Sequence, residues 1–264
     1  NKIGYPDVWK DYSSVVVKRD DPIANMYAAA LYERNRNTKK IDNPVDKQEW
    51  NMTPPTVNAY YSPPLNEIVF PAGILQPPFY DRTMDDAVNY GGIGVVIGHE
   101  LTHGFDDQGR KFDPNGNFRD WWTKEDGAEF EKRAACTADE YGSFEPVAGT
   151  KLNGRLTLGE NTADNGGSRI AMIALMNHLR KANPAAMKKV IDGFTPQQRF
   201  YLGFAQVWCE NVRPEQSKRL AQSDPHSPGR FRVNGTLLNN EDFDKAFGCK
   251  KGDKMVSANP CRTW

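Results

Sequence analysis

The spacing of apolar residues along the chain predicts a mainly helical protein with a minor β component. Stretches in which apolar residues recur three or four positions apart are typical of helices that bury one face. These stretches are residues 24–36, 85–105, 121–133, 156–180 and 195–212. Within residues 85–105, glycines stand at positions 91, 92, 94 and 98, and each lowers helix propensity by up to about 1 kcal/mol. We therefore expect another segment to pack very close to this helix.

Two short segments in the first third of the chain have the composition of β-strands. Residues 57–61 and 67–70 contain β-branched and aromatic residues, and turns rich in proline and asparagine lie beside them. We expect an antiparallel pair in which the prolines keep part of one edge free. The last 40 or so residues contain turns at 227–229 and 239–240, and we expect this end of the chain to be irregular.

Composition indicates a globular domain and argues against nucleic acid as a partner. Lys and Arg together number 34, as do Asp and Glu, so the formal net charge is zero, whereas nucleic-acid-binding domains have clustered excess base. Hydrophobic residues make up 38% of the chain and aromatic residues 11%, which is enough for a core. No apolar run approaches the roughly 18 residues of a membrane span. We expect a soluble domain, cut from a longer chain.

A His-Glu-Leu-Thr-His run is the most specific chemical feature of the sequence. On an α-helix, positions four apart lie about 40° from each other and one turn along the axis, so His99 and His103 face the same way. Two such imidazole nitrogens can bind a single Zn²⁺ ion. Glu100 is rotated by about 100° and can take a proton from a zinc-bound water without binding the metal. Ile97 and Leu101 are expected on the opposite side, where they would anchor the helix in the core.

A catalytic zinc site needs three protein ligands and an open position, so a third ligand must come from another segment. The candidates are His178, His226 and a carboxylate. Glu160 and Asp164 are four residues apart in a predicted helix, so one can bind zinc while the other accepts the free ring N–H of a histidine ligand. The alternative interpretation of this pair is a solvent-exposed acidic face.

Two further features are compatible with a metal site. Asp106 and Asp107 follow His103 by three and four residues, and either could accept the ring N–H of the second histidine. The alternative is that both are solvated residues at a helix end. Glycines at positions 159, 166 and 167 would permit a close approach between two helices.

Several motifs together resemble the zinc endopeptidases of the neprilysin and endothelin-converting enzyme type. They occur in the family's order over nearly the whole chain, which is far more specific than the histidine motif alone. The matching segments are residues 58–61, 68–78, 96–107, 120–122, 158–167, 226–232 and 261–264. The resemblance implies a thermolysin-like zincin catalytic domain, an α+β fold that is mainly helical with a small β-sheet. It also implies that residues 1–264 are the C-terminal catalytic portion of a longer chain whose N-terminal helical region is absent here.

The resemblance also implies which residues hold the metal. His99, His103 and Glu160 would be the ligands of one Zn²⁺ ion. Asp106 and Asp164 would orient the two histidine rings. This set selects among the alternatives that the spacing of the residues leaves open.

The remaining roles implied by the resemblance concern catalysis and substrate. Glu100 would be the general base and would return its proton to the leaving amine. His226 would donate to the developing oxyanion. Arg232 would hold a substrate carbonyl, and Asn58 and Ala59 would bind the peptide main chain, which suits a free strand edge.

The same resemblance implies how the four cysteines are bonded. It implies a disulfide between Cys136 and Cys261, and it implies that Cys209 and Cys249 pair with the missing N-terminal part of the same protein. The alternatives for Cys209 and Cys249 are a bond to each other or free thiols. Disulfides indicate an oxidising compartment, so we expect an extracellular, periplasmic or cell-surface ectodomain.

The predicted function is a zinc metalloendopeptidase that hydrolyses internal bonds of small peptides by means of a zinc-bound water activated by Glu100. The main alternative is a zinc-binding fragment that is inactive without its N-terminal half. A second alternative is a different zincin, such as an aminopeptidase. That activity would need a group that recognises a free amine, and the sequence contains no such motif.

Overall fold

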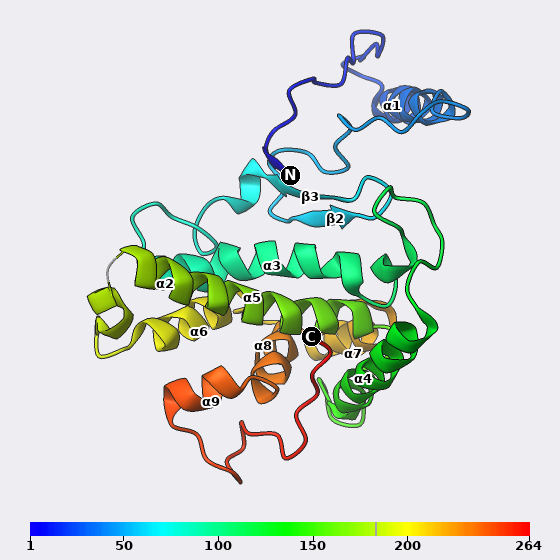
Figure 1. Cartoon of the computed structure of the whole chain (residues 1–264). Coiled ribbons are helices and arrows are strands. Elements are labelled where there is room, and N and C mark those ends of the chain that lie inside the picture. Colours follow the sequence, from blue (N-terminus) through cyan, green and yellow to red (C-terminus); the bar gives the residue numbers. More distant parts are fainter. Residues whose placement is uncertain (183) are drawn as a thin grey trace.

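The computed structural model describes residues 1–182 and 184–264 and has a mainly helical α+β fold with one small sheet (Figure 1). The strands are β1 (Lys2–Gly4), β2 (Tyr60–Ser62) and β3 (Glu67–Pro71). The α-helices are α1 (Pro22–Thr38), α2 (Asp86–Asn89), α3 (Val95–Thr102), α4 (Lys124–Ser143), α5 (Leu158–Ala182), α6 (Pro196–Val207), α7 (Pro214–Ser223), α8 (Gly229–Leu238) and α9 (Glu241–Phe247). The sheet lies on one side of α3 and the long α5 lies on the other. The fold class predicted from the sequence is therefore confirmed.

The sheet contains the predicted antiparallel pair and one additional strand. Its order is β1-β3-β2, with Tyr61 of β2 opposite Ile68 of β3. The predicted first strand, residues 57–61, is displaced toward the C-terminus, because β2 begins at Tyr60. The additional strand β1 pairs in parallel with β3 and comes from a polar segment that has no strand pattern. Within the described residues, β2 pairs only with β3, so its outer edge has no partner strand.

Three of the four glycines of the predicted 85–105 helix, at positions 91, 92 and 98, lie where other segments approach its backbone. A π-helical turn, Tyr90–Gly94, joins α2 to α3, and α3 then crosses α5 in close contact (Figure 1). A Cβ atom on Gly98 would lie 2.7 Å from the carbonyl oxygen of Gly167, and one on Gly167 would lie 2.5 Å from the backbone nitrogen of His99. These distances are too short for real Cβ contacts. The prediction that another segment packs very close to this helix is confirmed.

The prediction for Ile97 and Leu101 is wrong. Their exposed fractions are 44% and 48%, so neither residue anchors α3 in the core. The helix is held by two other faces. Gly98 and Thr102 lie against α5, while Val96 packs against the cluster beneath the sheet. Helical periodicity indicates that a face is apolar, but it does not say which of several faces the fold buries.

The expectation of an irregular end holds for residues 248–264, which contain no helix or strand, and is wrong for the segment before them. That segment is largely helical. It forms α8 and α9, and α7 precedes them. The sequence of α8 contains two glycines and several polar residues, which weakens its apolar periodicity. Even so, Arg232 and Thr236 of this helix are buried. A buried polar face needs partners from other segments, and such partners cannot be seen in a local pattern.

Two other helices differ from their predicted extents. α4, predicted at residues 121–133, begins at Lys124 and continues to Ser143, and the side chain of Thr123 accepts a hydrogen bond from the backbone of Asp126 at its start. α1 is present, but none of its residues is buried. Among the described residues, no helix combines the length and apolar character needed to cross a bilayer.

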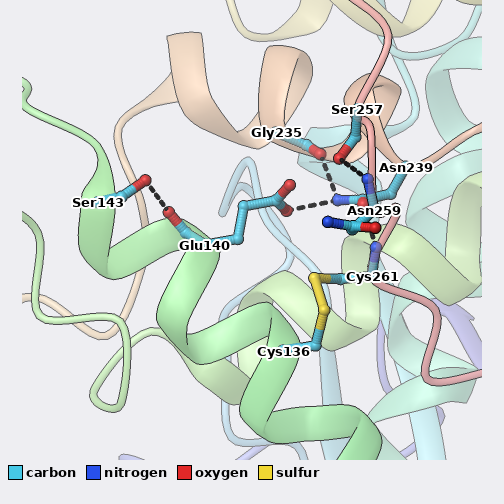
Figure 2. The surroundings of a disulfide bond; sticks show 8 residues. All are labelled: Cys136, Glu140, Ser143, Gly235, Asn239, Ser257, Asn259 and Cys261. Atoms are coloured by element: carbon cyan, nitrogen blue, oxygen red, sulfur yellow. Dashed lines mark hydrogen bonds between the residues drawn. A yellow bond between two sulfur atoms is a disulfide. The ribbon is translucent and has the colours of Figure 1, made fainter.

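The predicted disulfide between Cys136 and Cys261 is confirmed, and it joins α4 to the end of the chain (Figure 2). Asn239, which follows α8, reinforces the same junction. Its side-chain nitrogen donates to Glu140 of α4 at 2.6 Å, and its side-chain oxygen accepts from the backbone nitrogen of Cys261 at 2.5 Å. Cys209 and Cys249 are free thiols. A covalent bond and a buried amide thus hold the tail against α4 and α8.

We expect Gly167→Ala to destabilise the protein by about 1–3 kcal/mol or more, because the added methyl group would overlap the backbone of α3. Urea unfolding followed by circular dichroism measures the change. Gly142→Ala in α4 is the matched control, since its Cβ would meet no atom closer than 3.9 Å, and alanine favours a helix. Equal stability of the two variants would contradict the close crossing of α3 and α5.

Candidate metal centre

The two histidines of the motif converge as their spacing predicts. His99 lies in the last turn of α3 and His103 lies at its C-terminal end, where a 3-10 turn begins. The Nε2 atoms of the two rings are 3.0 Å apart. The rings meet edge to face, with an interplanar angle of 86°. The two nitrogens therefore point into one small space.

The other nitrogen of each ring contacts a carboxylate. Nδ1 of His99 lies 2.8 Å from Asp164 of α5, and Nδ1 of His103 lies 2.7 Å from Asp106. Because an ionised carboxylate only accepts hydrogen bonds, each Nδ1 must donate one. In neutral rings the two Nε2 atoms would then present lone pairs to each other at 3.0 Å. This arrangement repels unless a proton or a cation lies between them.

The third converging group is the carboxylate of Glu160. Its Oε2 atom is 3.3 Å from Nε2 of His99, and its Oε1 atom is 3.5 Å from Nε2 of His103. A tetrahedral zinc ion with ligands at about 2.0–2.2 Å would separate neighbouring ligand atoms by about 3.3–3.5 Å. The two distances from Glu160 match this separation, and the 3.0 Å between the two nitrogens is slightly shorter than it.

The structure bears on three of the alternatives that the sequence leaves open. His178 lies elsewhere and contacts Asp86, so it is not part of this cluster. Asp106, and not Asp107, contacts His103. Glu160 and Asp164 are mostly or fully buried, which excludes the solvent-exposed acidic face.

Glu100 is buried beside the same nitrogens but has different surroundings. One of its carboxylate oxygens lies within 4.8 Å of the nitrogens of both histidines, and 5% of the residue is exposed. None of the described residues forms a hydrogen bond with this carboxylate, which lines the cavity above the cluster. Burial raises the pKa of Glu100. The group is therefore suited to exchanging a proton with a molecule in the cavity.

Buried charges around Asp164 determine the protonation of the centre. Burial opposes the charged form of His99, but the hydrogen bond and charge of Asp164 outweigh it and raise the pKa of His99 to about 10. Burial would raise the pKa of Glu160, but the two histidines and Arg232 lower it to about 2. In the same way, Arg232 and His99 hold the pKa of Asp164 well below its usual value despite its burial. A proton on His99 thus occupies the place that a cation would take.

His226 lies at the open side of the cluster, in the loop before α8. Its Nε2 atom is 3.3 Å from Oε1 of Glu160, and its Nδ1 atom is 2.8 Å from Asp224. The side chain is half exposed and lines the cavity. Sequence analysis selected His226 but missed Asp224, although an acidic residue two positions before the histidine was a usable signal.

Arg232 is held by other residues of the chain more firmly than its expected role in binding a substrate carbonyl suggests. Its Nε and Nη2 atoms both donate to Asp164 at 2.7 Å, and its guanidinium lies 4.0 Å from the ring centre of Trp208. This bidentate pair holds α8 against α5. The Nη1 atom has no hydrogen-bond partner among the described residues, and Arg232 lines the cavity. Trp208 was not identified from the sequence.

The cavity over the cluster has a volume of about 1150 Å³ and reaches the edge of the sheet. Asn58 and Ala59 line it directly before β2, as expected for residues near a free strand edge. The side-chain oxygen of Asn58 accepts a hydrogen bond from the backbone nitrogen of Ala59 at 2.9 Å. The predicted site residues are thus brought around one cavity.

This fold and cluster define a candidate metal centre of the HExxH type, with its third acidic group on a second helix. Residues 58–263 match the model of peptidase family M13, and the chain belongs to this family.

Known proteins of this family are similar along nearly the whole chain. The chain is 44% identical to an endothelin-converting enzyme homolog of Locusta migratoria, covering 99% of this chain and 37% of that protein. It is 42% identical to neprilysin of Homo sapiens, covering 100% of this chain and 36% of that protein. A crystal structure of a zinc metalloprotease of Mycobacterium tuberculosis with an inhibitor superposes with a TM-score of 0.94 at 44% identity. That match covers 100% of this chain and 40% of the other, so the chain spans little more than a third of these relatives.

We expect the metal-free protein to lose stability as the pH rises from 6.5 to 10. His99 has a folded-state pKa of about 10 against 6.5 ordinarily. Its contribution is therefore complete below pH 6.5 and is lost as the pH rises through the folded-state pKa. Urea midpoints measured in the presence of a chelator test this.

Asp164→Asn is the control, since it removes the carboxylate that favours the charged ring. The decline between pH 6.5 and 10 should be smaller in this variant. An equal decline in both proteins would show that other groups cause it.

Proposed function

We propose that residues 1–264 form the catalytic domain of a zinc-dependent endopeptidase that hydrolyses internal bonds of small peptides. The observation that supports this most strongly is the convergence of two imidazole nitrogens and one carboxylate within 3.0–3.5 Å. Membership of peptidase family M13 supports the same reaction class.

The donor set suits zinc, with His99, His103 and Glu160 as ligands and one position left open for reactants. Zinc, when bound, supplies Lewis acidity that polarises a peptide carbonyl and lowers the pKa of water. Asp164 and Asp106 hold the two histidine rings in the tautomer whose Nε2 lone pair faces the metal.

Glu100 acts as the general base in this proposal. Its buried carboxylate accepts a proton from the attacking water and delivers it to the nitrogen of the leaving peptide. The raised pKa of Glu100 helps its carboxylate to hold this proton between the two steps. His226, fixed by Asp224, donates a hydrogen bond to the oxygen on which negative charge develops.

Substrate binding uses the edge of the sheet and the free end of Arg232. An extended peptide can add to the unpaired edge beside β2, where Asn58 and Ala59 contact its main chain. The Nη1 atom of Arg232 donates to a substrate carbonyl, while its other nitrogens stay bound to Asp164.

The remaining thiols and the disulfide suggest a setting for this activity. We infer that Cys209 and Cys249 bond to another part of the same protein, because Cys209 is exposed and the relatives are much longer than this chain. The Cys136–Cys261 disulfide favours an extracellular, periplasmic or cell-surface location.

We expect Glu100→Gln to bind one zinc ion per chain, as the wild type does, and to lose activity by at least about 100-fold. Zinc is measured by mass spectrometry of the metal, and cleavage with an internally quenched peptide blocked at both ends. Because blocked ends exclude exopeptidases, mapping the cut also tests internal cleavage.

Glu125→Gln, at an exposed position in the first turn of α4, is the matched control and should retain full activity. Equal cleavage by wild type and Glu100→Gln would rule out the general-base role. Zinc binding with no cleavage by the wild type would favour an inactive zinc-binding fragment, and the absence of zinc binding would refute the site.

A further inference from the structure

We propose that the hydrogen bond between Ser227 and Asn161 positions His226 over the metal centre. This inference rests on the proposed function, because it concerns the geometry of a group that acts in that reaction. Ser227 and Asn161 do not touch the reacting atoms. They are positioning residues that act through His226.

The bond joins the two segments at the points where they present their functional groups. The hydroxyl of Ser227 donates to the side-chain oxygen of Asn161 at 2.8 Å. Ser227 directly follows His226, and Asn161 directly follows Glu160. The exposed fractions of Ser227 and Asn161 are 3% and 0%, so water does not compete for this bond.

Apart from its 3.3 Å contact with Glu160, His226 makes no polar contact within the described residues that joins the loop to α5. Its side chain is half exposed, so packing on all sides does not hold it. Asp224 bonds to both the backbone and the ring of His226 at 2.8 Å. However, Asp224 is bonded through its backbone to Leu220 of α7 and not to α5. Asp224 thus sets the orientation of the His226 ring but not the distance of the ring from Glu160.

Beyond Ser227 the chain is held independently. The backbone nitrogen of Gly229, at the start of α8, donates to Glu210 at 2.7 Å, and Arg232 binds Asp164 one turn further on. Among the described residues, the Ser227 hydroxyl makes the only side-chain hydrogen bond from residues 224–228 to α5, apart from the contact of His226 with Glu160. The Ser227–Asn161 hydrogen bond therefore controls how closely this loop approaches the metal centre.

Asn161 is oriented for this task by its own surroundings. Its side-chain nitrogen donates at 3.0 Å to the hydroxyl of Thr157, which directly precedes α5. This bond directs the side-chain oxygen toward Ser227. Removing the Ser227 hydroxyl would leave a buried acceptor without a donor, and the loop would shift to relieve it.

The test is a double-mutant cycle on the zinc-loaded protein with the quenched peptide. We expect Ser227→Ala to lower kcat by about tenfold or more, as small displacements of reacting groups do, with KM changed less than about twofold. In the His226→Gln background, Ser227→Ala should cause no further loss, because the residue acts only through His226. Equal losses in both backgrounds would overturn the proposal.

A second variant and a control separate positioning from stability. Asn161→Ala should reproduce the effect of Ser227→Ala and should likewise have no effect without His226. Tyr201→Phe removes a comparable buried hydrogen bond, from its hydroxyl to Asn240, far from the cavity lining, and should leave kcat unchanged. A fall in kcat for Tyr201→Phe equal to that of Ser227→Ala would overturn the proposal.

Amide hydrogen exchange supplies a readout that does not need activity. In Ser227→Ala, the backbone amides of Asp224, His226 and residue 227 should exchange at least about threefold faster while α5 stays protected, because only the loop loses a support. Unchanged exchange in the loop would refute the proposed role of the Ser227–Asn161 hydrogen bond. If the wild type cleaves no peptide, the proposed function fails, and the exchange measurement alone decides whether Ser227 holds the loop.

Discussion

The close crossing of α3 and α5 is the constraint on which the rest of the structure depends. Gly98 and Gly167 allow the two backbones to touch, and this contact brings the histidines of one helix against the carboxylates of the other. A methyl group on Gly167 would lie 2.5 Å from the backbone nitrogen of His99, well inside ordinary contact distance, so the two helices would have to move apart. Gly98 and Gly167 lower the helix propensity of these segments, but the site residues converge only because the two glycines allow this contact.

The crossing also concentrates buried charge that must be balanced. Asp164 and Glu160 face His99 and Arg232 with little access to solvent. Buried carboxylates are tolerated only when they are paired, and here Arg232 supplies a permanent positive charge. The second positive charge is a proton on His99, and in the proposed function a metal ion would take its place. Arg232 is thus a structural requirement of the centre, whatever further contact its free Nη1 atom makes with a substrate.

The sequence predicted which residues converge in the site better than it predicted which helix faces are buried. The positions of His99 and His103 follow from helix geometry, and the resemblance to a known family selected Glu160 and the Cys136–Cys261 pair. The burial of α8 could not be predicted, because its polar residues find their partners on α4 and α5, far away in the sequence. Ile97 and Leu101 were misplaced for the complementary reason: an apolar helix face indicates burial only when the fold covers that face.

The helix α8 shows how contacts between distant parts of the sequence shape the candidate site. Its N-terminal loop holds His226 over the centre, Arg232 binds Asp164 from its first turns, and Asn239 at its end is tied to α4 and Cys261. The disulfide at the end of the chain therefore fixes the same element that completes the site. These polar contacts act together with the burial of Phe231, Val233 and Leu237 in placing α8. The parts of the chain that are hardest to predict locally are those whose place is determined by the centre itself.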